Sequence, residues 1–257
     1  MKKGNNKFKT IRVALLLLII CNSFFLYSQD SELTEPVVIE PVIKGKPPSD
    51  AVVLFDGGSL ENFVSRKTGE PAGWKVNGKK FTVVPGTGDI ITKQKFGSCQ
   101  VHLEWKTPVE DVKMKRSGQG SGNSGIYFMQ WFEIQILNSY INKTGFKGQA
   151  AAVYGEYPPL VNASLPPGEW QTYDIVFIAP VFNTDGSVKS YGYLTVFHNG
   201  ILVQYHSQVG EDIDFDEVGE DIDFDVEKVT GEVYKMPILL QDHGNKVSFR
   251  NFWVREL

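Results

Sequence analysis

The sequence is poor in cysteine and histidine and has no excess of positive charge. Of its 257 residues, two are Cys and four are His, and the formal net charge at pH 7 is −4. Only Cys99 lies beyond residue 28, so the chain after that point cannot form an internal disulfide and depends on a hydrophobic core. The acidic balance gives no basic footprint for nucleic acid or for a membrane surface. No segment keeps a helical period, which argues against a helical bundle.

Residues 1–28 have the composition of a secretory signal peptide. Basic residues come first, the apolar run Val13 to Ile20 follows, and the small residue Ser28 ends the segment. The run is short for a membrane span. A lipidated Cys21 would normally follow a small residue, and Ile20 is bulky. We therefore expect cleavage near Ser28 and an exported protein, periplasmic or secreted, without a membrane span.

The rest of the chain divides into a linker and one domain. Residues 29–49 are rich in proline and lack a periodic apolar pattern, which predicts an extended linker. Residues 50–257 consist of short apolar or alternating runs between turn signals, which predicts a single all-β domain, a jelly-roll β-sandwich. The expected strands are 52–55, 81–84, 89–92, 100–105, 132–136, 172–178, 193–198, 201–205, 238–240 and 247–254.

The stretch from Gly118 to Tyr140 is the first place to look for a ligand. Closely spaced glycines lead into the alternating segment 132–136, in which the apolar residues share one face and Glu133 and Gln135 share the other. Glycines let the backbone approach a ligand closely. A carboxylate on a concave sheet face is placed to act as a general base or acid. The alternative is a solvated strand residue that pairs with a cation.

Three other motifs in the chain suggest chemistry that their context does not support. The glycines from Gly120 to Gly125 fit the dinucleotide-binding pattern, but a strand pattern follows where a helix is needed. Ser124 has no nucleophile elbow around it. The acidic segment 209–216 recurs at 218–225 and resembles half of a calcium loop, yet it lacks the turn glycine and the closing glutamate. We interpret it as a solvated insertion. No cofactor is evident, and a divalent metal stays possible.

Further polar side chains lie at positions where chemistry is possible. His102 and Glu104 share one face of the strand expected at 100–105. His243 follows a strand and precedes a turn, where an imidazole is free to meet a ligand. Arg250 lies in an otherwise apolar strand, as either an ion-pair partner or a fork that binds oxygen atoms. The long segment 145–170 is rich in Gly, Pro and Ala, which predicts a functional loop.

Several short motifs occur in an order that one known family shares. They are 54–57 (LFDG), 88–90 (GDI), 102–105 (HLEW), 122–127 (GNSGIY), 133–140 (EIQILNSY), 166–171 (PPGEWQ), 198–200 (HNG), 240–244 (LQDHG) and 249–251 (FRN). On these motifs the chain resembles the 3-keto-disaccharide hydrolase family, whose fold is similar to concanavalin A-like sandwiches. Asn138 departs from the family, which usually has Asp there, and this weakens any metal or charge role at that position.

The resemblance implies an enzyme that cleaves glycosides already oxidised to a ketone at the sugar C3. A base removes the acidic C2 hydrogen, the aglycone leaves C1 by elimination, and water adds back to give the 3-keto sugar. Direct hydrolysis would give the same products. An upstream glycoside 3-dehydrogenase is the implied partner in the pathway. A lectin-like binding module without catalysis is the alternative, because fold does not fix function.

On that chemistry we assign roles to individual residues. Glu133 is expected to be the base, His243 the acid or electrophile, and Arg250 the group that stabilises the oxyanion. No metal ligands are assigned. The expected contacts to the carbohydrate substrate are His102, Glu104, Asn123, Gln135, Tyr154, Gln241 and Asp242.

Overall fold

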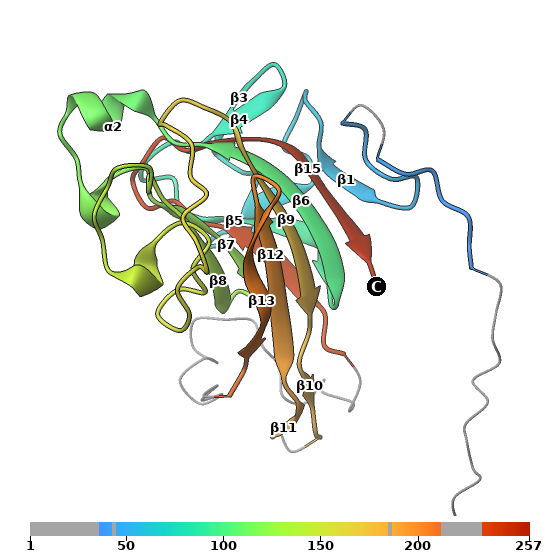
Figure 1. Ribbon diagram of the computed structural model, residues 1–257. Coiled ribbons are helices and arrows are strands. Elements are labelled where there is room, and N and C mark those ends of the chain that lie inside the picture. Colours follow the sequence, from blue (N-terminus) through green and yellow to red (C-terminus); the bar gives the residue numbers. More distant parts are fainter. Residues whose placement is uncertain (1–35, 43–44, 185–186, 212–232) are drawn as a thin grey trace, which may run out of the picture. The chain divides into compact units, whose positions relative to one another are not determined.

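The computed structural model describes residues 36–42, 45–184, 187–211 and 233–257, and residues Glu40–Leu257 form one unit (Figure 1). The expected signal peptide, the linker as far as residue 35 and residues 212–225 of the acidic repeat lie outside the described residues. Within the described part, no helix is both long and apolar enough to cross a membrane.

Two antiparallel sheets make up most of the fold, with the larger one in front in Figure 1. The larger sheet has the order β13 (Ile201–Val209), β12 (Gly192–His198), β9 (Gln171–Ile178), β6 (Cys99–Lys106), β15 (Ser248–Glu256), β4 (Lys80–Thr82) and β3 (Lys75–Asn77), and β1 (Val52–Phe55) also pairs with β15. The smaller sheet has the order β2 (Phe63–Ser65), β5 (Ile90–Phe96), β14 (Met236–Leu240), β7 (Ser124–Phe128) and β8 (Phe132–Ile136).

Short elements complete the fold. Strands β10 (Val181–Phe182) and β11 (Val188–Ser190) form a separate ribbon. The helical elements are α2 (Val109–Lys113), η1 (Gly118–Gly120) and η2 (Phe146–Gly148). Helix α2 was not expected, because a helix of five residues is too short to show a 3.6-residue period in the sequence.

The core lies between the two sheets and is made by alternate residues of their strands. Val101, Leu103 and Trp105 of β6 are fully buried, and their neighbours on the strand are only partly buried. Phe177 of β9 meets Phe128 of β7 with ring centroids 4.7 Å apart, which joins the two sheets. The expected all-β sandwich in a single domain is therefore confirmed.

The expected strand at 132–136 is the second half of a hairpin. Strand β7 precedes it, and Ser124 pairs with Ile136 at one end and Phe128 with Phe132 at the other. The turn has Met129 at φ 53° and Gln130 at φ 58°. Both values lie in the left-handed region that usually needs Gly or Asn. The sequence therefore carries no turn signal here, in contrast to the hairpin expected at 199–200.

Candidate functional site

The outer face of the smaller sheet carries a row of side chains that run across its strands. Gln135 of β8 pairs with Gly125 of β7, and the backbone N–H of Gln241 donates to the carbonyl of Gly125 at 3.1 Å. The backbone N–H of Asp242 then donates to a carboxylate oxygen of Asp89 at 2.8 Å. Glycine in the middle of this row leaves a hollow between Gln241 and Gln135.

A second row lies beside the first on the same face. Tyr127 pairs with Glu133, and the backbone N–H of Tyr154 donates to the carbonyl of Glu133 at 3.0 Å. Val153 faces the core, so its neighbour Tyr154 faces outward with Glu133. We call the two rows the polar strip; its members are Asp89, Asn123, Gly125, Tyr127, Glu133, Gln135, Tyr154 and Gln241.

The hollow at Gly125 holds the carboxylate of Glu133. A Cβ atom at Gly125 would come within 2.4 Å of Oε1 of Glu133, so only glycine leaves space for the carboxylate there. Burial, together with the negative charge of Asp89, raises the pKa of Glu133 to about 7 against an opposing hydrogen bond from Tyr127. The carboxyl group is therefore present in both protonation states near neutral pH, as a general acid–base catalyst requires.

A tyrosine and a glutamine hold the carboxylate in place. The hydroxyl of Tyr127 hydrogen-bonds to Glu133, and Nε2 of Gln241 donates to the same hydroxyl at 2.8 Å. Burial and the charge of Glu133 raise the pKa of Tyr127, so the phenol keeps its proton. The phenol oxygen accepts a hydrogen bond from Gln241 and keeps its own hydrogen, so it donates that hydrogen to Glu133.

Three amide oxygens of the strip are buried and have no hydrogen-bond donor among the described residues: those of Asn123, Gln135 and Gln241. Their amide nitrogens are engaged, since Asn123 donates to the carbonyl of Gln119 at 2.8 Å and Gln135 donates to Oε1 of Gln119 at 3.2 Å. Buried acceptors without a donor cost free energy, on the order of 1–3 kcal/mol each.

Sequence reasoning missed several residues of this face. Tyr127 and Asp89 both lie in motifs that carried the family resemblance, yet neither was assigned a role. Arg66 forms an ion pair with Asp89 at 3.6 Å and donates to Gln130 of the β7–β8 turn at 3.2 Å. Gln119 connects the glycine segment with β8. Their roles follow from strand pairing, which spacing along the chain does not reveal.

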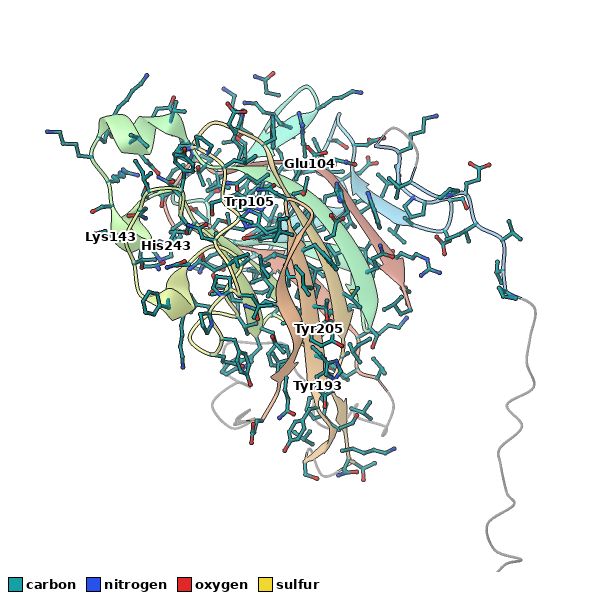
Figure 2. All side chains as sticks on the ribbon, viewed as in Figure 1. Glu104, Trp105, Lys143, Tyr193, Tyr205 and His243 are labelled. Atoms are coloured by element: carbon teal, nitrogen blue, oxygen red, sulfur yellow. The ribbon has the colours of Figure 1, made fainter. Side chains whose placement is uncertain are left out.

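The turn after β14 carries two of the predicted residues. The carboxylate of Asp242 accepts the backbone N–H groups of Gly86, Gly88 and Gly244 at 2.8, 3.0 and 3.0 Å, so its oxygens hold two loops together. The side chain of His243 is exposed and close in sequence to Gln241. In Figure 2 it is labelled well away from Glu104.

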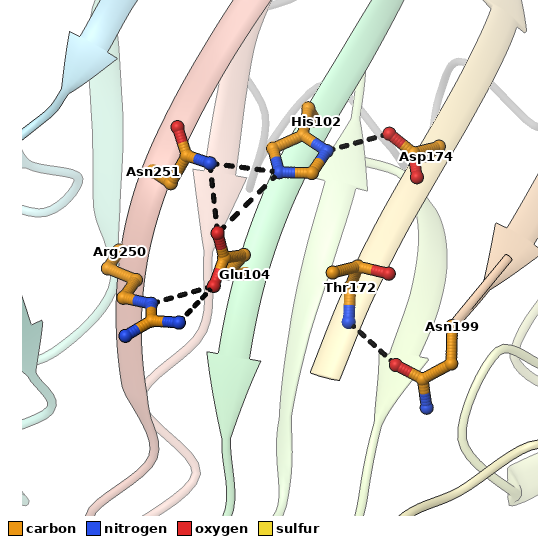
Figure 3. Close-up of polar contacts among 7 residues, drawn as sticks. All are labelled: His102, Glu104, Thr172, Asp174, Asn199, Arg250 and Asn251. Carbon is orange, nitrogen blue, oxygen red and sulfur yellow. Dashed lines mark hydrogen bonds and ion pairs between the residues drawn. The ribbon is translucent and has the colours of Figure 1, made fainter. Parts of the chain in front are cut away.

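The other predicted residues form a cluster on the opposite side of the sandwich (Figure 3). Nδ1 of His102 lies 2.7 Å from a carboxylate oxygen of Asp174, and Nε and Nη2 of Arg250 lie 2.7 and 2.6 Å from Oε2 of Glu104. A bulge in β15 turns Asn251 outward beside Arg250, where it donates to Glu104 at 2.9 Å. We call these five residues the rear cluster.

The rear cluster cannot act on the same sugar as Glu133. Its side chains leave the outer face of the larger sheet, Glu133 leaves the outer face of the smaller one, and the core of roughly 10 Å between the sheets separates them. The assignments of Arg250, Glu104 and His102 to the site of Glu133 are therefore corrected. Each of the three side chains points outward from its strand, as the sequence pattern predicts. The sequence does not say, however, to which sheet a strand belongs.

Mutual pairing explains the electrostatics of the rear cluster. Burial lowers the pKa of His102, but the hydrogen bonds and charges of Asp174 and Glu104 outweigh this effect and raise it to about 9. The hydrogen bond from His102, with contributions from Asn251 and Arg250, lowers the pKa of Glu104 to about 2 against the effect of burial. The cluster is thus a fixed arrangement of charges at neutral pH.

No group of three or more His, Cys, Asp or Glu side chains within the described ranges is placed to hold a metal ion. Asn138, which stands where the resembled family usually has Asp, is buried and donates to the hydroxyl of Ser121 at 3.1 Å. The strip has two carboxylates, Asp89 and Glu133, together with several neutral amides and two tyrosine hydroxyls, a donor and acceptor set that suits a polyhydroxylated ligand.

Solved structures resemble this fold. A Parabacteroides distasonis protein whose name provisionally assigns it to the glycosyl hydrolases is 39% identical, with a TM-score of 0.71 over 90% of this chain and 96% of that chain. Two further structures from that organism, named in the same way, are 22% and 21% identical, with TM-scores of 0.53 and 0.51. The matches cover 81% and 80% of this chain and 94% and 99% of the two matched chains. At these identities the likeness supports the fold and nothing about activity. No curated protein matches the chain.

A family model matches residues 50–255, which include strands β1 to β14 and all of β15 except Glu256. The match therefore covers both the polar strip and the rear cluster, and it agrees with the resemblance carried by the sequence motifs. The chain belongs to the 3-keto-alpha-glucoside-1,2-lyase-like domain family.

Proposed function

We propose that the protein cleaves glycosides whose sugar has been oxidised to a ketone at C3, and that it releases the aglycone and the 3-keto sugar. One observation carries the proposal: the carboxyl group of Glu133, with its pKa raised to about 7, lies over Gly125 in a strip of buried acceptors. A proton acceptor that is half ionised at neutral pH suits the removal of a hydrogen made acidic by a neighbouring ketone.

The elimination route uses Glu133 twice. The carboxylate takes the C2 proton, the electron pair forms an enolate across C2 and C3, and collapse of the enolate expels the aglycone oxygen from C1, which must gain a proton. Water then attacks C1 and gives one proton to the group that protonated the aglycone oxygen, while the protonated Glu133 returns a proton to C2. In direct hydrolysis, Glu133 would instead deprotonate the water that attacks C1.

Other residues of the face would bind and polarise the sugar. Tyr154, which is exposed and lies beside Glu133, would contact its hydroxyl groups. Arg66 extends over the same face to Gln130 and takes over the oxyanion role first given to Arg250. The exposed His243 remains our choice for the proton donor to the leaving oxygen, since its imidazole is free to meet a substrate.

The test compares an aryl 3-keto-glucoside with the same glucoside before oxidation. We expect aglycone release from the keto form only. Equal cleavage of both would contradict the proposal, and binding of either without any cleavage would favour the lectin-like alternative. In D₂O, elimination and hydration place deuterium at C2 of the product, whereas direct hydrolysis does not. The 3-keto sugar incubated alone with the protein controls for later exchange.

We also propose that the protein is exported and works after a glycoside 3-dehydrogenase, because its substrate must arrive with the C3 ketone already formed. The intact mass of the exported protein checks the first part, with an N-terminus near Gln29 expected and an acylated Cys21 contradicting it.

A further inference from the structure

A groove lined with cations lies at the end of the larger sheet, on its outer face, where Lys106 of β6 and Arg250 of the rear cluster both lie over the ring of Trp170. Its volume is about 930 Å³, and its walls come from α2, the start of β4, the end of β6 and the segment from Gly244 to Ser248. A smaller cavity of about 390 Å³ continues it past Lys80 and Lys246 toward Lys75. Each of the two volumes lies in the range of pockets that bind small molecules.

The positive charges in the groove are largely without partners. Lys80, Lys106, Lys113 and Lys246 all line it, and none of them has an ion pair among the described residues. Burial, together with the charges of Lys80 and Arg250, lowers the pKa of Lys106, which shows that these cations repel one another. Such a concentration of lysine is unexpected on a chain whose net charge is −4.

The carboxylates nearby neutralise only part of this charge. Asp111 is buried and is committed to Arg116 at 3.0 Å and to the backbone N–H of Gly122 at 2.8 Å. The charges of Glu110 and Glu169 raise the pKa of Lys106, but both side chains are exposed to solvent. An anion that enters the groove would therefore replace repulsion among lysines with attraction, and it would have several ammonium donors within reach.

The groove also has apolar surface between its lysines. Pro85, Pro108, Val109 and Met114 line it. Beside it, the indole of Trp170 lies under Nζ of Lys106, with 4.7 Å between the nitrogen and the ring centroid. Apolar surface between cations suits a ligand that has flat CH faces and bears separate anionic groups, as the rings of acidic sugars do.

The groove shares a wall with the polar strip. Thr107 and Asp111 of the groove both contact Gly122: a Cβ atom at Gly122 would lie 2.6 Å from Cγ2 of Thr107. Gly122 directly precedes Asn123 of the strip. On the other side, only four residues lie between Gln241 of the strip and Lys246 of the groove, a span of at most about 18 Å. A substrate of a few sugar units would have to pass around this end of the sandwich to occupy both.

We propose that this groove binds an acidic extension of the substrate, a saccharide that bears carboxylates or sulfate esters. The choice of a saccharide rests on the proposed function, while the choice of an anion rests on the lysines alone. The protein would then act on 3-keto units within acidic glycans, or on glycosides whose leaving part is acidic.

Calorimetric titration of the full exported protein with oligosaccharides of one length tests the proposal. Tetragalacturonate, which bears carboxylates, and a sulfated maltotetraose, which bears sulfate esters alone, are the acidic probes, and maltotetraose is the neutral one. We expect an acidic probe to bind at least about tenfold more tightly than the neutral one, with an affinity that falls as salt screens the charges. Equal affinities would overturn the proposal. A single-stranded DNA of similar charge that binds as tightly as the sugars would overturn the saccharide class.

Matched variants locate the binding. Lys80→Gln with Lys246→Gln should weaken acidic binding by about tenfold or more, whereas Lys46→Gln with Lys67→Gln makes the same change in net charge outside the groove and should not. Equal losses in both would overturn the groove as the site. The groove variant should cleave a neutral 3-keto-glucoside at the parent rate. If the parent cleaves no 3-keto-glycoside but still binds the acidic sugar through these lysines, only the proposed reaction fails.

Discussion

The carboxylate of Glu133 lies over the α-carbon of Gly125 on the neighbouring strand, where a Cβ atom would come within 2.4 Å of Oε1. Gly125→Ala should therefore displace the carboxylate without breaking the strand, since Gly125 does not have a positive φ and alanine is not strained there. A displacement of about 1 Å at a catalytic group costs on the order of 100-fold in rate. We expect kcat on a 3-keto-glucoside to fall by about 10- to 100-fold with the melting transition retained.

Gly120→Ala is the matched control for that variant. Gly120 lies in the same glycine-rich segment, it too lacks a positive φ, and nothing lies within 4 Å of a Cβ atom placed on it. Its kcat should equal that of the parent. Similar losses in both alanine variants would show that the segment needs its flexibility, and that the space over Gly125 is not the cause.

Glu133→Gln should remove most turnover and keep the fold. The amide keeps the size of the side chain but cannot accept the C2 proton, and loss of a general base costs about 10²–10⁴-fold in rate. At pH 8 the variant should also melt at a higher temperature than the parent, because it no longer places a negative charge in a site that disfavours one. Measurements of kcat and of thermal melts decide both points. Turnover close to that of the parent would exclude Glu133 as the base.

The rate of the parent enzyme should depend on the ionisation of Glu133. Burial raises its pKa from 4.5 to about 7, and the base form exists only above that value. Therefore kcat/KM should rise about tenfold per pH unit below neutrality and level off above pH 7. Since the folded state holds this proton more tightly than the unfolded one, the contribution of Glu133 to stability should fall as pH rises from 4.5 through 7. A flat profile of kcat/KM between pH 5 and 8 would contradict the assignment of the base.

The alternation of apolar residues was enough to predict most strands and the face of each side chain. Glu133 and Gln135 lie outward together, as the period-two pattern of 132–136 indicates, and Asn199 and Gly200 form the expected tight turn, with φ values of 52° and 78°. The close spacing of the glycines indicated the glycine segment, and the chemistry implied by the family resemblance led to Gln241. Periodicity fixes these features because each depends only on neighbours along one strand.

The assembly of the site depends on which strands pair, and a single sequence does not contain that information. Arg250 was grouped with Glu133 although β15 lies in the larger sheet and β8 in the smaller one. Conversely, Arg66 and Asp89 were passed over, since their part in the site follows from pairing between β2, β5 and β14. The hairpin before Glu133 was missed because Met129 and Gln130 adopt positive φ without any of the residues that usually signal such a turn.

The ion pair between Glu104 and Arg250 should affect stability and leave turnover unchanged, in contrast to Glu133. Glu104→Gln removes the charge that Arg250 and His102 share, and the side chain of Glu104 is only 17% exposed. We expect a loss of about 1–2 kcal/mol in the free energy of unfolding, after allowance for solvent screening. Turnover should not change, because the cluster lies across the core from the polar strip. A large fall in kcat in a stable variant would return Glu104 to the active site.

The contribution of His102 to stability should depend on pH in a defined direction. Its pKa is raised from 6.5 to about 9 in the folded protein, so the imidazolium stabilises the fold fully below pH 6.5 and loses that contribution as pH rises through 9. On the acid side, Glu104 contributes above pH 4.5 and loses its contribution as pH falls through about 2. The difference in the free energy of unfolding between parent and His102→Gln should therefore be largest near pH 5–6 and shrink toward pH 10.

Urea titrations across this range measure that difference, and Tyr193→Phe, on the same outer face but outside the cluster, serves as the control. A difference that stays constant with pH would mean that His102 acts through packing against Trp253, whose ring stacks on the imidazole at 5.4 Å, and not through its charge.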